Sequence, residues 1–361
     1  MKSGNKHSFH QTGFTMVEIM VGLAIGMLAT VVIMQVFSVF EAQKRTTTGT
    51  ADAQTNGSIA LYNISREMQF AGFPLMPIDD LSPLECTTLT VNGALDLTVP
   101  NRLSPVAIAD GGAAAGASDS ITLRYGDSLM GGVSTQITGD PAASTLPAPA
   151  IDVPVGSNLG CRAGDIALSI NGTTCAMSSV TNATSATPTT ITLADNTAVT
   201  AGAAVAGANI ACLGTWNEIV YAVNNGNLQR GGQDAVAGIV NLQAQYGISA
   251  AANSNQIVQW VNATAATGWN APPTVADRNR IKAVRVAVVA RNAKMEAGNV
   301  TAACSSTTVA APTGLCAWAG SVASPAPVID LSNDPNWARY RYRVFETIIP
   351  LRNVIWSRDK L

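Results

Sequence analysis

The sequence has little charge and almost no histidine. Charged residues make up 12% of the 361 residues, and the formal net charge is −2. This share is about half of that in an average soluble domain. The two histidines, His7 and His10, lie at the very start of the chain. The composition favours an exported, β-rich protein over a cytosolic helical enzyme, and the small net charge makes nucleic acid an unlikely partner.

Because no histidine follows residue 10, several catalytic and metal arrangements cannot form in the rest of the chain. Ser-His-Asp triads, Cys-His pairs and His-ligated zinc all require one. The sequence also contains no Cys-x-x-Cys pair and no phosphate-binding G-x-x-x-x-G-K-[ST] loop. We therefore expect no metal, no cofactor and no enzymatic reaction. Two carboxylates that act on a glycosidic bond stay open as an alternative, since the sequence does not show whether two meet.

One long stretch has a single charged residue. From Phe14 to Phe40 there are 27 residues, and Glu18 is the only charged one. A helix of that length spans roughly 40 Å, enough to cross the ~30 Å hydrocarbon core of a membrane. A carboxylate inside a membrane costs about 2.5 kcal/mol or more, so Glu18 needs a shallow position or a dedicated partner. A signal anchor or a cleaved secretory signal is the alternative for this stretch.

The residues at the start of this run resemble those of type IV pilins. A short basic leader ends in Gly13, Phe14 follows, and Glu18 stands at the fifth position from Phe14. The resemblance implies cleavage after Gly13 by a prepilin peptidase and N-methylation of Phe14. It also implies that Glu18 binds the free amine of Phe14 in another subunit, because four residues of helix separate the two groups of one chain by roughly 6 Å. The alternative for Glu18 is a shallow place at the membrane surface.

A pair of glycines in the apolar run, Gly22 and Gly26, has G-x-x-x-G spacing. This spacing lets two membrane helices approach closely, although small residues are common in such helices in any case.

The helix is predicted to continue through residues 41–73 in a more polar form. The segment Thr46–Thr50 has poor helix propensity and is expected to form a weak or flexible joint. Gly72 and Pro74 are expected to end the helix. Spacings of three and four residues connect Gln54, Gly57, Leu61, Ile64, Met68 and Ala71, and the last four of these predict an apolar stripe that packs on the head.

From about residue 86 the pattern changes to short β-type runs between turn signals. The predicted strands are Thr87–Val91, Ser120–Tyr125, Asp165–Ile170, Thr189–Leu193 and Glu218–Val223, with a hairpin turn at Asn224–Asn227 that leads into Leu228–Arg230. Residues 235–247 fit either a short helix or a strand. In residues 280–291 and 339–349 basic and apolar residues alternate, which predicts strands with one wet and one buried face.

Three segments resemble the PilW family of minor pilins: residues 56–73 with the turn Ala71-Gly72-Phe73, the strand of residues 280–291, and the closing Pro350-Leu351-Arg352-Asn353. The resemblance covers both ends of the chain and is weak over about 90–275. It implies an α+β pilin-like fold, in which a long N-terminal helix packs on a β-rich head. The implied divisions are a leader (1–13), a transmembrane and filament-core helix (14–40), an amphipathic continuation (41–73) and an exported head with Ala/Thr/Gly-rich loops (74–361).

The resemblance also implies a function in type IV pilus assembly, in a priming or tip complex. Implied partners are other minor pilins, the major pilin, the prepilin peptidase and the assembly platform of the bacterial inner membrane. The head is expected in the periplasm before assembly and on the pilus afterwards, where it could support twitching motility, adhesion or DNA uptake. Two alternatives are a minor pseudopilin of a type II secretion system, which shares Gly13, Phe14 and Glu18, and a pilus-borne head that binds a surface ligand.

Six cysteines, all after the apolar run, favour disulfide bonds in an oxidising compartment. Six cysteines allow 15 pairings, so their spacing does not decide among them. Short local loops would pair Cys304 with Cys316 and Cys161 with Cys175, leaving Cys86 with Cys212.

The alternating basic residues leave two interpretations open. A basic patch with Tyr340 and Tyr342 would suit DNA. A solvated strand face with acidic partners on the next strand is the favoured interpretation. The basic residues are Arg280, Lys282, Arg339, Arg341 and Arg343.

Overall fold

The computed structural model describes residues 13–75, 83–91, 103–145, 149–184, 189–270 and 274–356. The chain divides into two compact units, Met1–Ala51 and Asp52–Leu361. The predicted leader, apart from Gly13, lies outside the described residues.

The first unit contains the beginning of the long helix α1 (Met16–Met68). Its apolar side chains are exposed on every side, with Phe14 82% and Phe37 66% exposed. By length and composition this helix can cross a membrane. The predicted joint at Thr46–Thr50 is helical, and the Thr50 hydroxyl donates to the Thr46 carbonyl oxygen at 2.8 Å. Such bonds inside the helix satisfy the hydroxyl without a break.

In the second unit, the last part of α1 packs its small and apolar residues on the head. The predicted apolar stripe is confirmed at Ile64, Met68 and Ala71, and Leu61 is half-buried. Of the two earlier positions at the same spacing, Gly57 is buried and Gln54 faces solvent. The ring of Phe345 covers Gly57 so closely that no Cβ would fit there. Small residues therefore bring the helix close to the sheet, which the apolar pattern alone did not show. The buried residues are Ala53, Gly57, Ala60, Ile64, Met68 and Ala71.

Gly72 reverses the chain after the helix. It has a φ of +79°, which L-residues with a side chain rarely adopt. Its N–H donates to the Arg124 carbonyl oxygen at 2.9 Å, which joins the turn to the neighbouring strand. The predicted end of the helix is thus confirmed.

Two antiparallel sheets form the core of the head and enclose, with α1, one hydrophobic cluster. Within the described residues, the first has the order β13 (Gln233–Ala237), β12 (Asn227–Arg230), β11 (Trp216–Asn224), β3 (Ser120–Gly126) and β2 (Val106–Ala109). The second has the order β15 (Ile257–Val261), β14 (Ile239–Ser249), β16 (Ile281–Met295) and β17 (Tyr340–Pro350). Residues 235–247, which fitted a helix or a strand, belong to β13 and β14.

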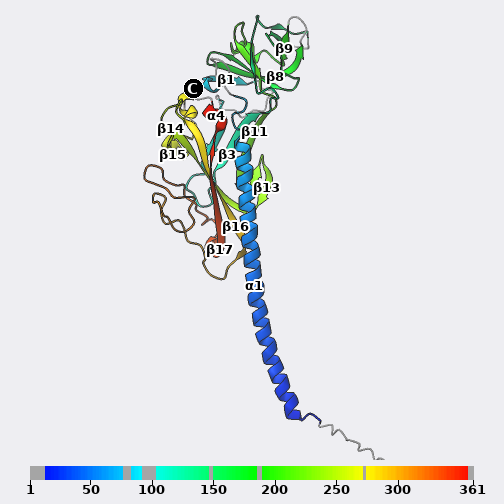
Figure 1. Ribbon diagram of the computed structural model, residues 1–361, viewed down its shortest axis with the longest axis vertical. Coiled ribbons are helices and arrows are strands. Elements are labelled where there is room, and N and C mark those ends of the chain that lie inside the picture. The colour runs from blue at the N-terminus through cyan, green and yellow to red at the C-terminus, as the bar shows by residue number, and fades with distance from the viewer. Residues whose placement is uncertain are drawn as a thin grey trace, which may run out of the picture. The chain divides into compact units, whose positions relative to one another are not determined.

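A lobe of residues 127–215 is inserted between two neighbouring strands of the first sheet. Trp216 of β11 pairs with Gly126 of β3, so the chain leaves and re-enters the sheet at adjacent positions. The lobe has its own cluster of buried apolar side chains and lies at one end of the second unit, beyond β11 (Figure 1). Its sheet has the order β4 (Ser134–Gln136), β10 (Asn209–Cys212), β7 (Ile166–Asn171), β8 (Thr174–Thr184), β9 (Thr190–Leu193), β6 (Ile151–Pro154) and β5 (Ala142–Ala143), and β1 (Thr88–Val91) pairs with β8.

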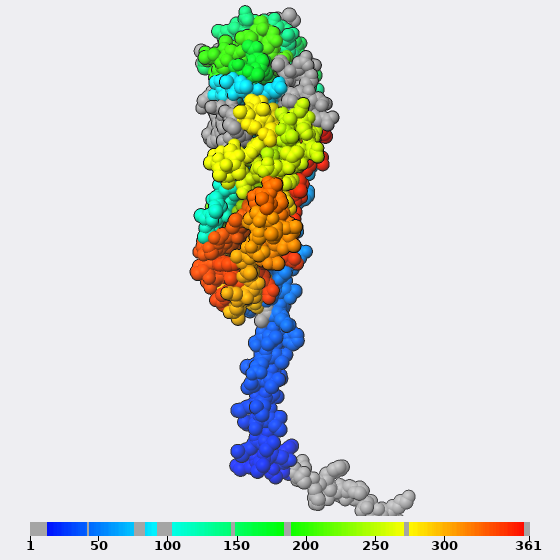
Figure 2. All heavy atoms as spheres, turned by 90° about the vertical axis from the view of Figure 1, so that its left-hand side faces the viewer, coloured from blue at the N-terminus to red at the C-terminus, as the bar shows by residue number. Residues whose placement is uncertain are grey.

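The long connection between β16 and β17, residues 296–339, forms a strap over the outer face of the second sheet. Figure 2 shows part of this strap, in orange, at the surface of the head. Its apolar side chains cover Ala287 and Val289 of β16. Both faces of β16 are therefore buried, one in the core cluster shared with α1 and the first sheet and the other under the strap. The strap side chains in this cluster are Leu315, Ala317, Trp318, Ala326, Ile329 and Leu331.

Burial on both faces corrects the prediction of a wet face on β16. Lys282 is fully buried, and its Nζ donates to the Ala252 carbonyl oxygen at 2.6 Å. Burial lowers the pKa of Lys282 to about 8. Arg285 lies over the ring of Trp318, with 4.5 Å from its guanidinium carbon to the ring centre. Trp318 of the strap thus covers Arg285, and the connection between β14 and β15 holds Lys282. Neither connection signals these contacts in the sequence.

The remaining helical turns are short. They are η1 (Pro83–Glu85), α2 (Thr197–Thr200), η2 (Ala265–Thr267), α3 (Val275–Asn279), η3 (Trp337–Arg339) and α4 (Arg352–Trp356).

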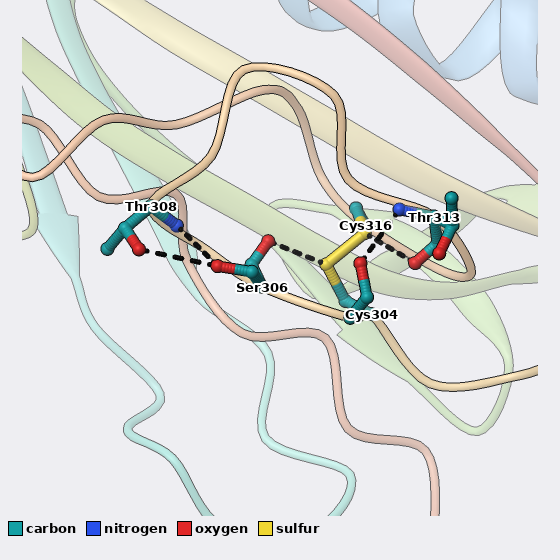
Figure 3. The surroundings of a disulfide bond; sticks show 6 residues. Cys304, Ser306, Thr308, Thr313 and Cys316 are labelled. Carbon is teal, nitrogen blue, oxygen red and sulfur yellow. Dashed lines mark hydrogen bonds between the residues drawn. A yellow bond between two sulfur atoms is a disulfide. The ribbon is translucent and has the colours of Figure 1, made fainter.

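The three disulfides confirm one predicted pair and correct two. Cys304 is bonded to Cys316 (Figure 3), but Cys86 is bonded to Cys175 and Cys161 to Cys212. Cys175 lies on the face of the lobe sheet that joins the main core, whereas Cys161 packs against the lobe's own cluster on the other face. The predicted Cys161–Cys175 bond would have to pass through the sheet.

Strand pairing explains why Cys86, and not Cys161, is the partner of Cys175. Strand β1 runs parallel to β8, with Leu89 opposite Cys175, and this brings the preceding Cys86 to the core face. Sequence separation favours short loops, but the face on which each side chain lies decides the pairing.

Candidate assembly site

The first turn of α1 is closed by a reciprocal pair of side-chain hydrogen bonds. Glu18 N–H donates to Thr15 Oγ1 at 3.3 Å, and Thr15 N–H donates to Glu18 Oε2 at 3.2 Å. The Thr15 hydroxyl also donates to Glu18 Oε2 at 3.2 Å. This is a capping box, in which two N–H groups at the start of the helix gain partners that the helix itself cannot supply.

The capping box holds the Glu18 carboxylate at the beginning of the helix, four residues after Phe14. A carboxylate has about four acceptor sites, so Glu18 can accept a further donor from another molecule. Thr15 is a residue that the sequence analysis missed. The spacing Thr15-x-x-Glu18 before an apolar run is a known signal for a capping box and could have indicated it.

Gly22 and Gly26 follow on the exposed part of α1. No atom lies within 4 Å of the position that a Cβ would occupy at either residue. Their surface is therefore open to another helix, and a contact between helices there stays a prediction.

A second polar site joins the last turns of α1 to the head. The buried carboxylate of Glu67 accepts hydrogen bonds from Tyr125 Oη at 2.8 Å, Tyr221 Oη at 2.5 Å and Arg230 Nε at 3.0 Å. A second bond from Arg230 Nη2 completes the ion pair. Strands β3, β11 and β12 each supply one donor, so a single carboxylate on the helix fastens three strands.

The four groups shift one another's pKa. Burial alone would raise the pKa of Glu67, but its bonds to Arg230, Tyr221 and Tyr125 lower the pKa below its usual value. Burial and the negative charge of Glu67 raise the pKa of Tyr125 to about 12 and that of Tyr221 further. Glu67 is thus ionised, and both tyrosines keep their protons for donation.

Replacing Glu67 with alanine is expected to destabilise the head by about 2–3 kcal/mol, because two tyrosine hydroxyls and a guanidinium lose their partner. The value is below that for a fully buried pair, since the Arg230 side chain is 46% exposed. Denaturant unfolding of the full chain in detergent measures the change. Tyr125→Phe, which removes one hydrogen bond, is the control and is expected to cost about 1 kcal/mol.

The contribution of Glu67 also depends on pH. The pKa of Glu67 is lower in the folded state than its unfolded value of 4.5. Its contribution to stability is therefore present above pH 4.5 and is lost as the pH falls through the folded pKa. A Glu67→Ala variant that loses as much stability on acidification as the wild type would contradict this assignment.

The arginines at the closing strands are mostly paired with acidic groups or carbonyls. Arg341 forms an ion pair with Glu296 at 3.0 Å, and Arg339 donates to the Glu296 carbonyl oxygen at 3.0 Å. Arg280 pairs with Asp277 at 3.2 Å. The structure does not gather the five predicted basic residues into one patch, because Lys282 is buried and most of the others are already engaged.

One ion pair connects two neighbouring strands, at an arginine that the prediction did not include. Arg285 of β16 pairs with Glu346 of β17 at 3.0 Å. Arg343 is exposed and has no ion pair among the described residues.

Comparison with known families gives two matches. Residues 8–34 match the prokaryotic N-terminal methylation motif, and residues 215–353 match the family described as type IV pilus-assembly protein W, PilW. No curated protein and no solved structure matches the chain. The first match covers Gly13, Phe14 and Glu18 and the beginning of the apolar helix. The chain is therefore a type IV pilin, with an N-terminal helix that anchors it in a membrane.

The second match identifies the kind of pilin. It begins at Thr215, where the chain leaves the inserted lobe, and extends through β11, β12 and β13 of the first core sheet and all of the second sheet to Asn353. Residues 215–275, where the sequence resemblance was weak, belong to the matched part. The chain belongs to the PilW family, and it is a minor pilin that takes part in type IV pilus assembly with other pilus components.

Proposed function

We propose that this minor pilin is a structural subunit, not an enzyme, of a small complex that starts pilus polymerisation and stays at the pilus tip. The observation that carries the proposal is the Glu18 carboxylate, held by Thr15 at the start of an exposed apolar helix. Such a helix needs a membrane or other helices around it, and its carboxylate needs a positive partner. The free amine of Phe14 in a neighbouring pilin supplies that partner after cleavage behind Gly13.

The inserted lobe supports a place at an end of the fibre. Residues 127–214 lie outside the matched part of the family and add bulk to the head. An end position gives a subunit neighbours on one side only, and a bulky head is accommodated there more easily than at a repeated position. The proposed partners are other minor pilins and the major pilin, with the prepilin peptidase and the inner-membrane platform acting on the chain beforehand.

The disulfides support a head outside the cytoplasm. Three bonds join all six cysteines of the chain, and such bonds persist in an oxidising compartment. We propose that the head lies in the periplasm before assembly and at the cell surface afterwards.

Deletion of the gene tests this proposal. Without the subunit we expect at least a ten-fold loss of surface pili and of twitching motility, restored by the wild-type gene, with no change in exoprotein secretion. Antibodies against the lobe are expected to label the ends of pili. Normal piliation together with a loss of secretion would contradict the proposal and indicate a pseudopilin.

A further inference from the structure

A small hollow opens where the β11–β12 turn of the first sheet, the second sheet and the strap meet. Its volume is about 180 Å³. The wall takes residues from the turn, from β14, β16 and β17, and from residues 331–334 of the strap. None of these residues belongs to the capping box or to the Glu67 site.

The centre of this wall is an ion pair without net charge. Arg291 Nη1 lies 3.4 Å from Asp334 Oδ2, and the two side chains are 34% and 35% exposed, so a small molecule can reach both. The other oxygen of Asp334 accepts from Asn336 N–H at 2.9 Å. Asp334 Oδ2 and the further N–H groups of the guanidinium keep capacity for additional hydrogen bonds.

Two asparagine amides lie in the same wall. Within the ranges that the structure describes, the side chains of Asn225 and Asn333 form no hydrogen bond with another residue. Both residues are exposed. Each amide offers two N–H donors and one carbonyl acceptor. The hollow therefore presents donors and acceptors together, with no net charge.

The fold fixes these groups in place without a ligand. Asn225 lies in a tight turn with a φ of 50°. Gly116 packs so closely on Asn333 that a Cβ at residue 116 would lie 2.5 Å from the Asn333 Cγ. The Gly116 N–H also donates to the Asp330 carbonyl oxygen at 2.7 Å, which fastens the strap at this point. A site with ordered groups loses less conformational entropy when it binds.

We propose that this hollow binds one neutral sugar ring, either free or at the end of a glycan chain. A hydroxyl group both donates and accepts, so neighbouring hydroxyls of a sugar match a wall of carboxylate, guanidinium and amides. The C–H face of the ring can pack on Val240 and Tyr342, which also line the hollow. Pockets for drug-sized ligands enclose about 300–1,000 Å³, so the smaller volume here admits a single ring.

Charged ligands match this wall less well than a sugar. An anion at Arg291 would lie close to the Asp334 carboxylate, and a cation at Asp334 would lie close to the guanidinium. Either would have to separate the ion pair, whereas hydroxyl groups add hydrogen bonds to it. The inference is independent of the proposed function, because binding a sugar requires neither a filament nor a second subunit.

Ligand-observed NMR tests the proposal on the full chain, in a detergent without a sugar head group. The probes are neutral aldohexoses, 6-deoxyhexoses and N-acetylhexosamines, each free and as the methyl glycoside. We expect saturable binding of at least one ring, with a dissociation constant in the millimolar range because so small a ligand makes few contacts. Binding of the methyl glycoside supports the end of a glycan chain, and binding of the free sugar alone supports a soluble sugar. Absence of saturable binding, or binding of inorganic phosphate or glycine instead, would overturn the proposal.

Variants of the two amides test whether the sugar binds in this hollow. Asn225→Gly keeps a residue that suits a φ of 50°, and Asn333→Ala changes an exposed side chain. Each is expected to weaken binding about five-fold, as the loss of a neutral hydrogen bond does, and the double variant about twenty-fold. Asn253→Ala, at an exposed asparagine between β14 and β15 and outside the hollow, is the control with wild-type affinity. Wild-type affinity in the double variant would place the sugar elsewhere and overturn this site.

Discussion

Replacing Glu18 with alanine is expected to leave cleavage after Gly13 intact and to reduce incorporation of the chain into pili by about ten-fold or more. In the proposed assembly the carboxylate accepts a charge-assisted hydrogen bond from the amine of a neighbouring Phe14, and bonds to charged groups contribute about 1.5–3 kcal/mol. N-terminal sequencing of the membrane-extracted chain checks cleavage. Immunoblots of sheared pili and membranes measure incorporation.

Two matched variants separate the charge of Glu18 from its role in the capping box. Glu18→Gln keeps a side chain that can accept from Thr15 N–H but lacks the charge. Thr15→Ala removes the threonine oxygen that accepts from Glu18 N–H and keeps the charge. We expect Glu18→Gln to fail in assembly as Glu18→Ala does, and Thr15→Ala to lose less than half of its incorporation. Normal assembly of Glu18→Gln would show that the cap, not the charge, is what assembly requires.

Removal of the Cys86–Cys175 bond is expected to cost the head about 4–5 kcal/mol, because the bond closes a long loop in the unfolded chain. The two cysteines are 89 residues apart. The cost approaches the whole stability of many domains, so we expect the Cys86→Ser/Cys175→Ser variant to be degraded in cells. Denaturant unfolding of the full chain in detergent, and its abundance in membranes, measure the effect.

The Cys304–Cys316 bond provides the control. Its cysteines are only 12 residues apart, and the same loop-entropy argument gives about 3 kcal/mol. The bond lies in the strap, where hydrogen bonds such as that from Thr308 N–H to Ser306 Oγ, at 3.2 Å, hold the surrounding loop (Figure 3). Equal losses for the two double variants would contradict the loop-length argument.

Features that depend on local pattern could be predicted from the sequence. The apolar run from Phe14, the end of the helix at Gly72 and the hairpin turn at Asn225 and Gly226 each have a short-range cause. Asn225 and Gly226 have φ values of 50° and 75°, as this turn requires. The expected strands are present within one or two residues of their predicted bounds, except that β16 extends four residues further, to Met295.

Features that depend on distant segments could not be predicted. Lys282 looked solvated because nothing near it in the sequence indicates that the connection between β14 and β15, which contains Ala252, supplies a partner for its amine. The partners of Cys86 and Cys161 depend on the two faces of a sheet whose strands come from separate parts of the chain. Glu67 looked like a polar residue outside the buried stripe, since its three donors come from strands roughly 60–160 residues further on.

The position of the lobe has a consequence for the order of folding. Strands β3 and β11 are neighbours in the sheet but are separated by about 90 residues, and closing so long a flexible loop is entropically costly. A lobe that folds first brings the two strands together and removes most of that cost. Because long-range pairing limits the folding rate of β-rich domains, we expect maturation of the head after export to wait for the lobe.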